Sequence, residues 1–529
     1  MQNRLLTFLQ KLPTWFPVAL GALLIRLPLI LLPGAGRDEA TYHYWAYHPE
    51  PAYSPLLQLA IRVSDWLPFS SLGKLRLPSI LSGIIVIFLF DRWLQDRKIP
   101  PSLKILLLST FALTPWQTYV GAILHPDNLL LLLILLFLIL LKRRWYGVAM
   151  LVAGFACWAK LTGLLLLPVA IGVLVIDPEI SRKSRFRYGI MGIMVALPVV
   201  VCLRGGMLAA MTEFGKIAPA SPVYQKVLVA VLTILLLAGP ALLIFSFVGV
   251  RSIHFRKRLV TDILPEQLAA LLIALVLVAV FGAAAIFQGQ IKGNWVLPAL
   301  ILLPPRQISL KLRRWMVSGL AISLLLSAGM VLALTHPGLL AKVEAHLTFL
   351  PGSYSLQAGT REARVSRTRS WAQRAMEYQS IAPFARQLHY IWQRERPRGA
   401  KFPRWIICDD YGLAAQLIYA WKSTGSNMII PTDPLFKNTL PPLDASREVA
   451  EIMLLSVQLP LPRLSPLNVL MENAGTVRHP ISKTPVRIAF LRNPLPPDLY
   501  LSGLEHPINK TDAKNEHSGE NDDIFHEPN

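Results

Sequence analysis

The chain has 529 residues, of which 53% are hydrophobic and 16% are charged, and its mean hydropathy is +0.46. Soluble proteins carry roughly a quarter charged residues, so this composition excludes an ordinary soluble protein and predicts a chain that lies largely in lipid. The formal net charge of +22 raises the alternative of nucleic-acid binding. The Lys and Arg residues gather in short loops between apolar runs, however, which favours a membrane protein without a nucleic-acid partner.

The first apolar run extends from Trp15 to Pro33 and contains Arg26. It follows Arg4 and Lys11 and lacks a small-residue cleavage site, so we expect an uncleaved anchor and not a signal peptide. A cation inside a span costs about 2.5–3.5 kcal/mol on insertion scales. We therefore expect Arg26 to face protein, either in a structural ion pair or in a polar cavity that binds a donor phosphate.

Two adjacent carboxylates, Asp38 and Glu39, follow the first run, and an aromatic segment with Tyr42, His43 and Trp45 comes next. One carboxylate can accept a proton from an acceptor hydroxyl, while the other orients the acceptor or binds a metal. The alternative is a solvated helix end, where charged residues cost little. The density of rings favours a catalytic site with aromatic or histidine contacts to a sugar or acceptor.

Further apolar runs bring the predicted number of membrane-spanning helices to about eleven. After the first run, the predicted spans are Leu77–Phe90, Leu103–Leu124, Leu129–Leu141, Trp145–Leu161, Leu164–Ile176, Gly189–Leu203, Leu228–Val250, Leu268–Phe287, Asn294–Leu303 and Met316–Leu334. With the N-terminus inside, every strongly basic loop lies on one side, which the positive-inside rule makes cytoplasmic. Asp38, Glu39, His125 and Asp127 then lie on the other side.

Two segments near that outer side carry further candidate residues. His125-Pro126-Asp127 precedes the fourth span, and Asp127 is either a second acidic site residue or a residue that interacts with the helix N-terminus. Lys160 lies between two apolar runs, beside Thr162 and Gly163. It suits a donor phosphate, and the alternative is a lysine that snorkels to the interface.

Lys292, Asn294 and Trp295 lie at the start of the tenth span and are candidates for interface anchoring or for contact with lipid phosphate, sugar or acceptor. The sequence has no convincing Walker loop, zinc cluster or serine triad. Its three cysteines lack metal-ligand spacing and indicate no disulfide framework. No cofactor is therefore expected, and whether a divalent metal takes part is left open.

After Leu334 the composition becomes more polar, charged and rich in proline. Trp405–Cys408 and Arg487–Leu491 are predicted strands, and Leu413–Trp421 is a predicted amphipathic helix. We expect a transmembrane catalytic domain over residues 1–335 and a small extracytoplasmic α/β domain over 336–508, which is an ordinary domain size. The polar, acidic stretch 509–529 is predicted to be disordered.

Four blocks of the chain carry a family resemblance: Arg37–Trp45, His125–Leu129, Trp158–Leu164 and Gly293–Ala299. In this order they resemble the acidic first-loop, Pro-Asp, Ser-Lys-Tyr-Thr-like and Asn-Trp-Pro-Ala-Pro-like motifs of the protein O-mannosyltransferase and aminoarabinose transferase superfamily. These proteins are polytopic glycosyltransferases of the GT-C fold. Ala52–Leu56 stands where the family often has an Asp-His-Pro-Pro stretch, and it lacks the His.

The resemblance implies a polyprenyl monophosphate sugar as donor, used on the external side of the membrane. The leading hypothesis is therefore an inverting transfer of the sugar to a lipid, glycan or protein acceptor, at the outer face of a bacterial inner membrane. By position, Asp38 is the implied base, Glu39 its neighbour and Asp127 the second acidic residue. Lys160 is the implied contact to the donor phosphate.

Two other functions are consistent with parts of the pattern. A transporter or lipid flippase would use Arg26 and the proline-interrupted spans as its substrate path, but no internal repeat is visible and the candidate polar residues lie on one side. A non-catalytic assembly protein with a degenerate site is disfavoured by the retained acidic residues.

Overall fold

The structure, a computed structural model, describes residues 12–47, 54–97, 99–216, 223–254, 265–288, 297–302 and 308–346, and then the shorter segments 354–356, 367–369, 375–376, 378–379, 381–395, 405–408, 411–421, 427–429, 452–456, 471–478 and 485–491. The chain divides into two compact units. The first consists of Met1–Gln387, Tyr411–Lys422 and Pro480–Lys483, and the second of Leu388–Asp410, Ser423–His479 and Thr484–Asn529. The predicted domain boundaries at residues 335 and 508 remain predictions.

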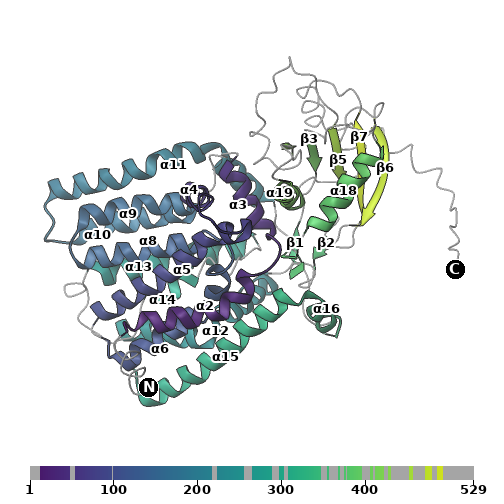
Figure 1. The fold of residues 1–529 in the computed structure, drawn as a ribbon. Helices are drawn as coiled ribbons and strands as arrows, with labels where there is room; N and C mark the ends of the chain where they lie inside the picture. The colour runs from purple at the N-terminus through teal and green to yellow at the C-terminus, as the bar shows by residue number, and fades with distance from the viewer. Residues whose placement is uncertain are drawn as a thin grey trace. The chain divides into compact units, whose positions relative to one another are not determined.

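The first unit is mostly helical (Figure 1), because a backbone in lipid must satisfy its hydrogen bonds within its own segment. Its helices up to the point where the composition changes are α2 (Trp15–Ile30), α3 (Arg37–Tyr47), α4 (Pro55–Ser64), α5 (Ser71–Asp96), α6 (Pro101–Ala112), α7 (Pro115–Val120), α8 (Asp127–Lys142), α9 (Tyr146–Ala159), the 3-10 helix η1 (Leu161–Leu165), α10 (Leu166–Ile176), α11 (Arg182–Lys216), α12 (Val223–His254), α13 (Pro265–Gln288), α14 (Leu297–Ile301) and α15 (Leu310–Thr335). The helices α16 (Pro337–His346) and α19 (Tyr411–Ala420) follow later in the chain.

Each predicted span overlaps a helix in the described residues. For Asn294–Leu303 that helix is α14, which has five residues, and Asn294 lies outside the described residues. Within the described residues, three helical segments are long and apolar enough to cross a membrane: Ser71–Asp96, Arg182–Val201 and Leu310–Thr335. Shorter apolar helices account for several other predicted spans. The total of about eleven crossings therefore remains a prediction.

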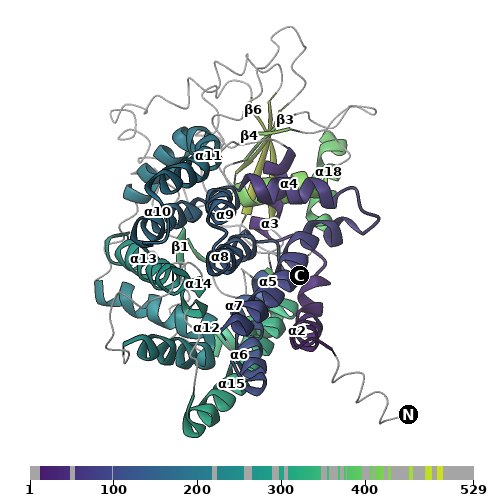
Figure 2. The same ribbon diagram turned by 90° about the vertical axis from the view of Figure 1, so that its left-hand side faces the viewer.

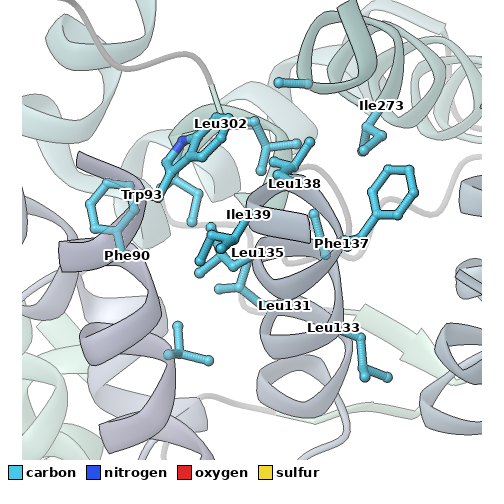
Figure 3. Close-up of a cluster of buried hydrophobic side chains, with 14 of the residues drawn as sticks. Phe90, Trp93, Leu131, Leu133, Leu135, Phe137, Leu138, Ile139, Ile273 and Leu302 are labelled. Carbon is cyan, nitrogen blue, oxygen red and sulfur yellow. The ribbon is translucent and has the colours of Figure 1, made fainter. Parts of the chain in front are cut away.

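Helix α8 lies inside the bundle, with α5, α9 and α13 around it (Figure 2). Its sequence is apolar on all sides, which is typical of a helix without a solvent face. Leu131, Phe137 and Leu138 pack in one cluster with Phe90 and Trp93 of α5 (Figure 3). Because lipid tails are as apolar as leucine, this cluster is stabilised mainly by close packing.

The predicted third span, Leu103–Leu124, is not one continuous helix. Helix α6 ends at Ala112, and α7 begins at Pro115, whose ring and missing N–H disfavour an unbroken helix. Thr114 is extended and its hydroxyl accepts the backbone N–H of Gln117 at 3.1 Å. Arg26 donates from Nη2 to the carbonyl of Ala112 at 3.2 Å, so a buried cation meets the negative end of α6.

Gly121 gives the Arg26 guanidinium the room it needs. A Cβ at Gly121 would lie 2.5 Å from Nη1 of Arg26 and 2.6 Å from its Cζ. We expect Gly121→Ala to lower the free energy of unfolding by about 1–3 kcal/mol, the usual cost of overpacking. Gly172→Ala is the matched control, since nothing lies within 4 Å of its added Cβ. Equal stability of both variants in detergent unfolding would contradict this account.

Strands occur only beyond α16 in the described residues. The pair β1 (Tyr354–Leu356) and β2 (Arg367–Arg369) is antiparallel. The second unit contains a sheet of order β4-β3-β5-β7-β6, made of β3 (Trp405–Cys408), β4 (Asn427–Ile429), β5 (Ile452–Ser456), β6 (Met471–Arg478) and β7 (Pro485–Leu491). Strand β3 runs parallel to both neighbours, whereas β7 is antiparallel to β5 and β6.

Local elements of this region agree with the sequence-based predictions. Strand β3 has the predicted bounds, Arg487–Leu491 lies within β7, and the predicted helix coincides with α19 to within a few residues. Helix α18 (Ala382–Glu395) was not predicted. That these elements form one extracytoplasmic α/β domain remains a prediction, and the stretch 509–529 lies outside the described residues.

Candidate functional site

Helix α3 carries the two tandem carboxylates and most of the candidate aromatic residues. Side chains four positions apart share a face of a helix, so Asp38 lies on the face of Tyr42 and Glu39 on the face of His43. Asp38 is exposed, whereas Glu39 is fully buried. The two carboxylates therefore have different surroundings although they are adjacent in sequence.

Glu39 is held by hydrogen bonds on both of its oxygens. Arg76 of α5 donates from Nε to Oε1 and from Nη2 to Oε2, each at 3.0 Å. The backbone N–H of Gly36 donates to Oε2 at 2.9 Å, and that of Leu124 donates to Oε1 at 3.0 Å. One carboxylate thus joins the first loop, helix α5 and the segment that precedes α8.

Arg76 also binds the end of α2, where the last backbone carbonyls of a helix lack intrahelical partners. Its Nη1 donates to the carbonyls of Leu29, Ile30 and Leu32 at 2.9–3.2 Å, and Nη2 donates to Gly34 at 2.6 Å. Sequence reasoning missed Arg76. A signal was present, because an arginine next to an apolar run is costly unless it faces protein.

The structure brings Asp127 and Lys160 together across 33 residues of sequence. Lys160 Nζ lies 2.5 Å from Oδ1 of Asp127, and both side chains are buried. His125 Nδ1 lies 3.3 Å from Oδ2 of the same carboxylate. Pro126, the residue before α8, makes no side-chain hydrogen bond to the N-terminus of the helix. Asp127 is thus engaged in a buried ion pair, and Lys160 does not have the geometry of a snorkelling lysine.

The segment around His125 also contacts α3 and α5. The ring of Tyr42 meets the ring of His125 edge-on, with 6.3 Å between centroids. The backbone N–H of His125 donates to the hydroxyl of Ser79 at 2.9 Å. Trp45 is buried, and its ring centroid lies 6.0 Å from that of Tyr42. Asp38 lies one turn from Tyr42 on the same helix face. Through Tyr42 and His125, helix α3 therefore adjoins the segment that holds the Asp127–Lys160 pair.

Ser54 connects α4 to the backbone before Lys160. Its hydroxyl donates to the carbonyl of Ala159 at 2.6 Å, and the side chain is buried. Ser54 has φ 50° and ψ 63°, a left-handed conformation that typically costs about 1–3 kcal/mol and often occurs at functional sites. Ser54 thus connects the start of α4 to the backbone next to Lys160.

Residues from much later in the chain hold the turn before α3. The carbonyl of Tyr378 accepts the N–H of Gly34 at 2.8 Å, and the side-chain amide of Gln416 donates to the carbonyl of Ala35 at 2.9 Å. A Cβ at Gly36 would overlap the ring of Tyr378. These contacts explain why the turn carries glycines.

Tyr378 and Tyr419 place two phenols beside α3. The hydroxyls of Tyr378 and Tyr119 form a hydrogen bond of 2.5 Å. The ring centroid of Tyr419 lies 5.1 Å from that of His43. Burial raises the pKa of Tyr378 well above its usual value, and the neighbouring Tyr119, Glu39 and Asp38 raise it further. Burial likewise raises the pKa of Tyr419, with Glu39 adding to the shift. Both phenols therefore remain neutral at physiological pH.

The remaining candidates are placed as follows. His43 lies 3.8 Å from the carboxylate of Asp65, to which the Tyr47 hydroxyl also donates. Arg26 donates a hydrogen bond to the carbonyl of Ala112, which is a structural contact. Its role in binding a donor phosphate remains a prediction. Among the described residues, no three His, Cys, Asp or Glu side chains could hold a metal ion together. Lys292, Asn294 and Trp295 lie outside the described residues.

Solved structures resemble this chain, although no protein-family model and no curated protein matches it. ArnT from Cupriavidus metallidurans bound to undecaprenyl phosphate aligns with a TM-score of 0.54 and 15% identity, over 90% of this chain and 97% of that one. The apo state of the same protein gives a TM-score of 0.50 and 13% identity, over 93% and 99%. The chain therefore shares the GT-C fold of ArnT. Three of its described helical segments are long and apolar enough to cross a membrane, which supports an integral membrane protein.

Proposed function

We propose that this GT-C-fold chain transfers a sugar from a polyprenyl monophosphate donor to a lipid, glycan or protein acceptor. The reaction would take place on the extracytoplasmic face of a bacterial inner membrane. The observation that carries the proposal is the separation of three carboxylates into distinct environments. Glu39 and Asp127 are buried and paired, while Asp38 is exposed and has no hydrogen bond or ion pair within the described residues. The ArnT structure with undecaprenyl phosphate supports the donor class.

Asp38 is the proposed general base. Proton abstraction needs a carboxylate oxygen with an open coordination site, and of the three site carboxylates Asp38 best meets that condition. The acceptor hydroxyl would give its proton to Asp38 while its oxygen bonds to the anomeric carbon of the sugar. The bond from that carbon to the phosphate oxygen breaks, and the phosphate leaves with the electron pair. A single displacement of this kind inverts the anomeric centre.

Lys160 is the proposed cation that stabilises the departing phosphate. Its ammonium group has three N–H donors, and the contact to Asp127 uses one of them. Asp127, with His125 beside it, would hold the Lys160 ammonium group in position for the donor phosphate. Positioned cationic donors are a large source of transition-state stabilisation because charge develops on the leaving group. Glu39 and Arg76 would position α3 and take no part in proton transfer.

The transfer itself can be tested on purified protein in lipid nanodiscs. A synthetic polyprenyl phosphate sugar, labelled in the sugar, is incubated with an extract of cell-envelope lipids and glycans. We expect polyprenyl phosphate to be released and the label to move to an acceptor. Movement of intact donor across a vesicle membrane, without release of polyprenyl phosphate, would identify a flippase or transporter and contradict the proposal.

Replacing Lys160 by Gln is expected to lower the transfer rate by about 10²–10³-fold, the range for loss of one preorganised electrostatic donor. The single change also leaves Asp127 buried without its cation, so stability falls as well. The double variant Asp127→Asn/Lys160→Gln separates the two effects, since no charge of the pair remains buried. We expect it to recover stability in thermal unfolding but not activity. Recovery of both would assign the pair a purely structural role.

A further inference from the structure

A cluster of exposed basic and aromatic residues lies at the opposite ends of the helices from the proposed site. We call it the basic patch, and it consists of Arg143, Trp145, Arg182, Lys183, Phe186 and Arg187. The first two residues belong to the turn between α8 and α9, and the others to the start of α11. Trp145 is 56% exposed and Phe186 is 72% exposed.

Several contacts bring the two segments of the patch together. Tyr146, at the start of α9, donates to Oδ2 of Asp177 at 2.6 Å, and Arg185 donates to the carbonyl of Asp177 at 2.7 Å. Arg144 and Glu179 form an ion pair between the same segments. Helices α9 and α11 lie side by side in Figures 1 and 2.

The same contacts engage the nearby carboxylates. Asp177 is buried against Tyr146, and Glu179 is paired with Arg144. Arg143, Arg182 and Lys183 have no carboxylate partner within the described residues. A further carboxylate near Tyr146, that of Glu266, is buried. The patch therefore presents exposed positive charge next to two exposed aromatic rings.

We propose that the basic patch binds the headgroup of an anionic phospholipid, such as cardiolipin. Clusters of Lys and Arg at the ends of membrane helices attract anionic lipid headgroups, by about 1 kcal/mol for each cation near the surface. Aromatic side chains such as Trp145 are typical of the level of the headgroups. The lipid would bind on the side of the membrane that faces the basic loops, so this site is separate from that of the proposed transfer reaction.

Native mass spectrometry of the detergent-purified protein can count bound cardiolipin against phosphatidylcholine. We expect the wild type to prefer cardiolipin, and Arg182→Gln/Lys183→Gln/Arg187→Gln to bind it at least about tenfold more weakly. The matched control is Lys311→Gln/Arg313→Gln/Arg314→Gln. It removes three exposed cations at the start of α15, a helix on the other side of the bundle in Figures 1 and 2.

Three outcomes would overturn the proposal: a wild type without preference for cardiolipin, equal losses in the two triple variants, or displacement of cardiolipin by inorganic phosphate. Trp145→Ser/Phe186→Ser should also weaken binding, and an unchanged affinity would remove the rings from the site. All substituted side chains are exposed, so an unchanged unfolding midpoint in phosphatidylcholine is expected for each variant. Because lipid counting requires no sugar transfer, its outcome is independent of the proposed enzymatic function.

Discussion

Replacing Asp38 by Asn is expected to lower kcat for sugar transfer by about 10²–10⁴-fold, the usual contribution of a general base. The amide keeps the size of the side chain but cannot accept the proton of the acceptor hydroxyl. KM for the donor should change little, since the lost interaction belongs to the transition state. The measurement is the rate of polyprenyl phosphate release at saturating donor.

The stability of Asp38→Asn distinguishes a catalytic role from a structural one. Asp38 is exposed and has no bonded partner within the described residues, so its unfolding midpoint should match the wild type. Glu39→Gln is the neighbouring control, because it weakens a buried ion pair and should lower stability. Full turnover by Asp38→Asn would remove Asp38 as the base. A loss of stability equal to that of Glu39→Gln would make the acid a structural residue.

Replacing Arg76 by Met is expected to be the most destabilising single change at the site, at about 3–5 kcal/mol, because it leaves the Glu39 carboxylate buried without its cation. The carbonyls of Leu29, Ile30, Leu32 and Gly34 lose a donor in the same variant. Arg92→Met, at an exposed position of the same helix, serves as the control and should have little effect. The measurement is the free energy of unfolding in detergent micelles.

A double variant shows whether Arg76 and Glu39 act as one unit. Residues in direct contact have coupling energies of about 0.5–3 kcal/mol, so Glu39→Gln/Arg76→Met should cost less than the sum of the two single changes. Additive losses would mean that the two side chains stabilise the fold independently. Because this pair joins α2, α3 and the segment before α8, we also expect Arg76→Met to lower transfer activity.

The candidate site thus combines two buried ion pairs with one exposed acid, Asp38. The Glu39–Arg76 pair fixes the turn that leads into α3, and the Asp127–Lys160 pair fixes the start of α8 against the end of α9. Ser54 and Gln416 add contacts from two further segments. Under the proposed function, this arrangement holds Asp38 in place without using its carboxylate for structure.

The sequence alone predicts the helices that form from apolar runs, and it identifies the segments that carry the candidate site residues. Apolar runs become helices because a backbone in lipid must bond to itself locally, and this rule requires no knowledge of neighbouring segments. The prediction of one span over Leu103–Leu124 missed the break at Thr114-Pro115, although proline disfavours a continuous helix. The residue types and their positions beside apolar runs identify the first loop, His125-Pro126-Asp127 and Lys160 as candidate segments without any knowledge of their contacts.

Only the tertiary structure decided which charges pair and which remain open. Glu39 meets Arg76 across 37 residues, Asp127 meets Lys160 across 33, and Ala35 meets Gln416 across 381. Adjacent acids such as Asp38 and Glu39 look equivalent in sequence, because burial and partner choice depend on helices that pack from distant parts of the chain. A buried carboxylate without a cation is strongly destabilising, so Glu39 and Asp127 each lie next to a cation. Which carboxylates become buried is decided only when the helices pack.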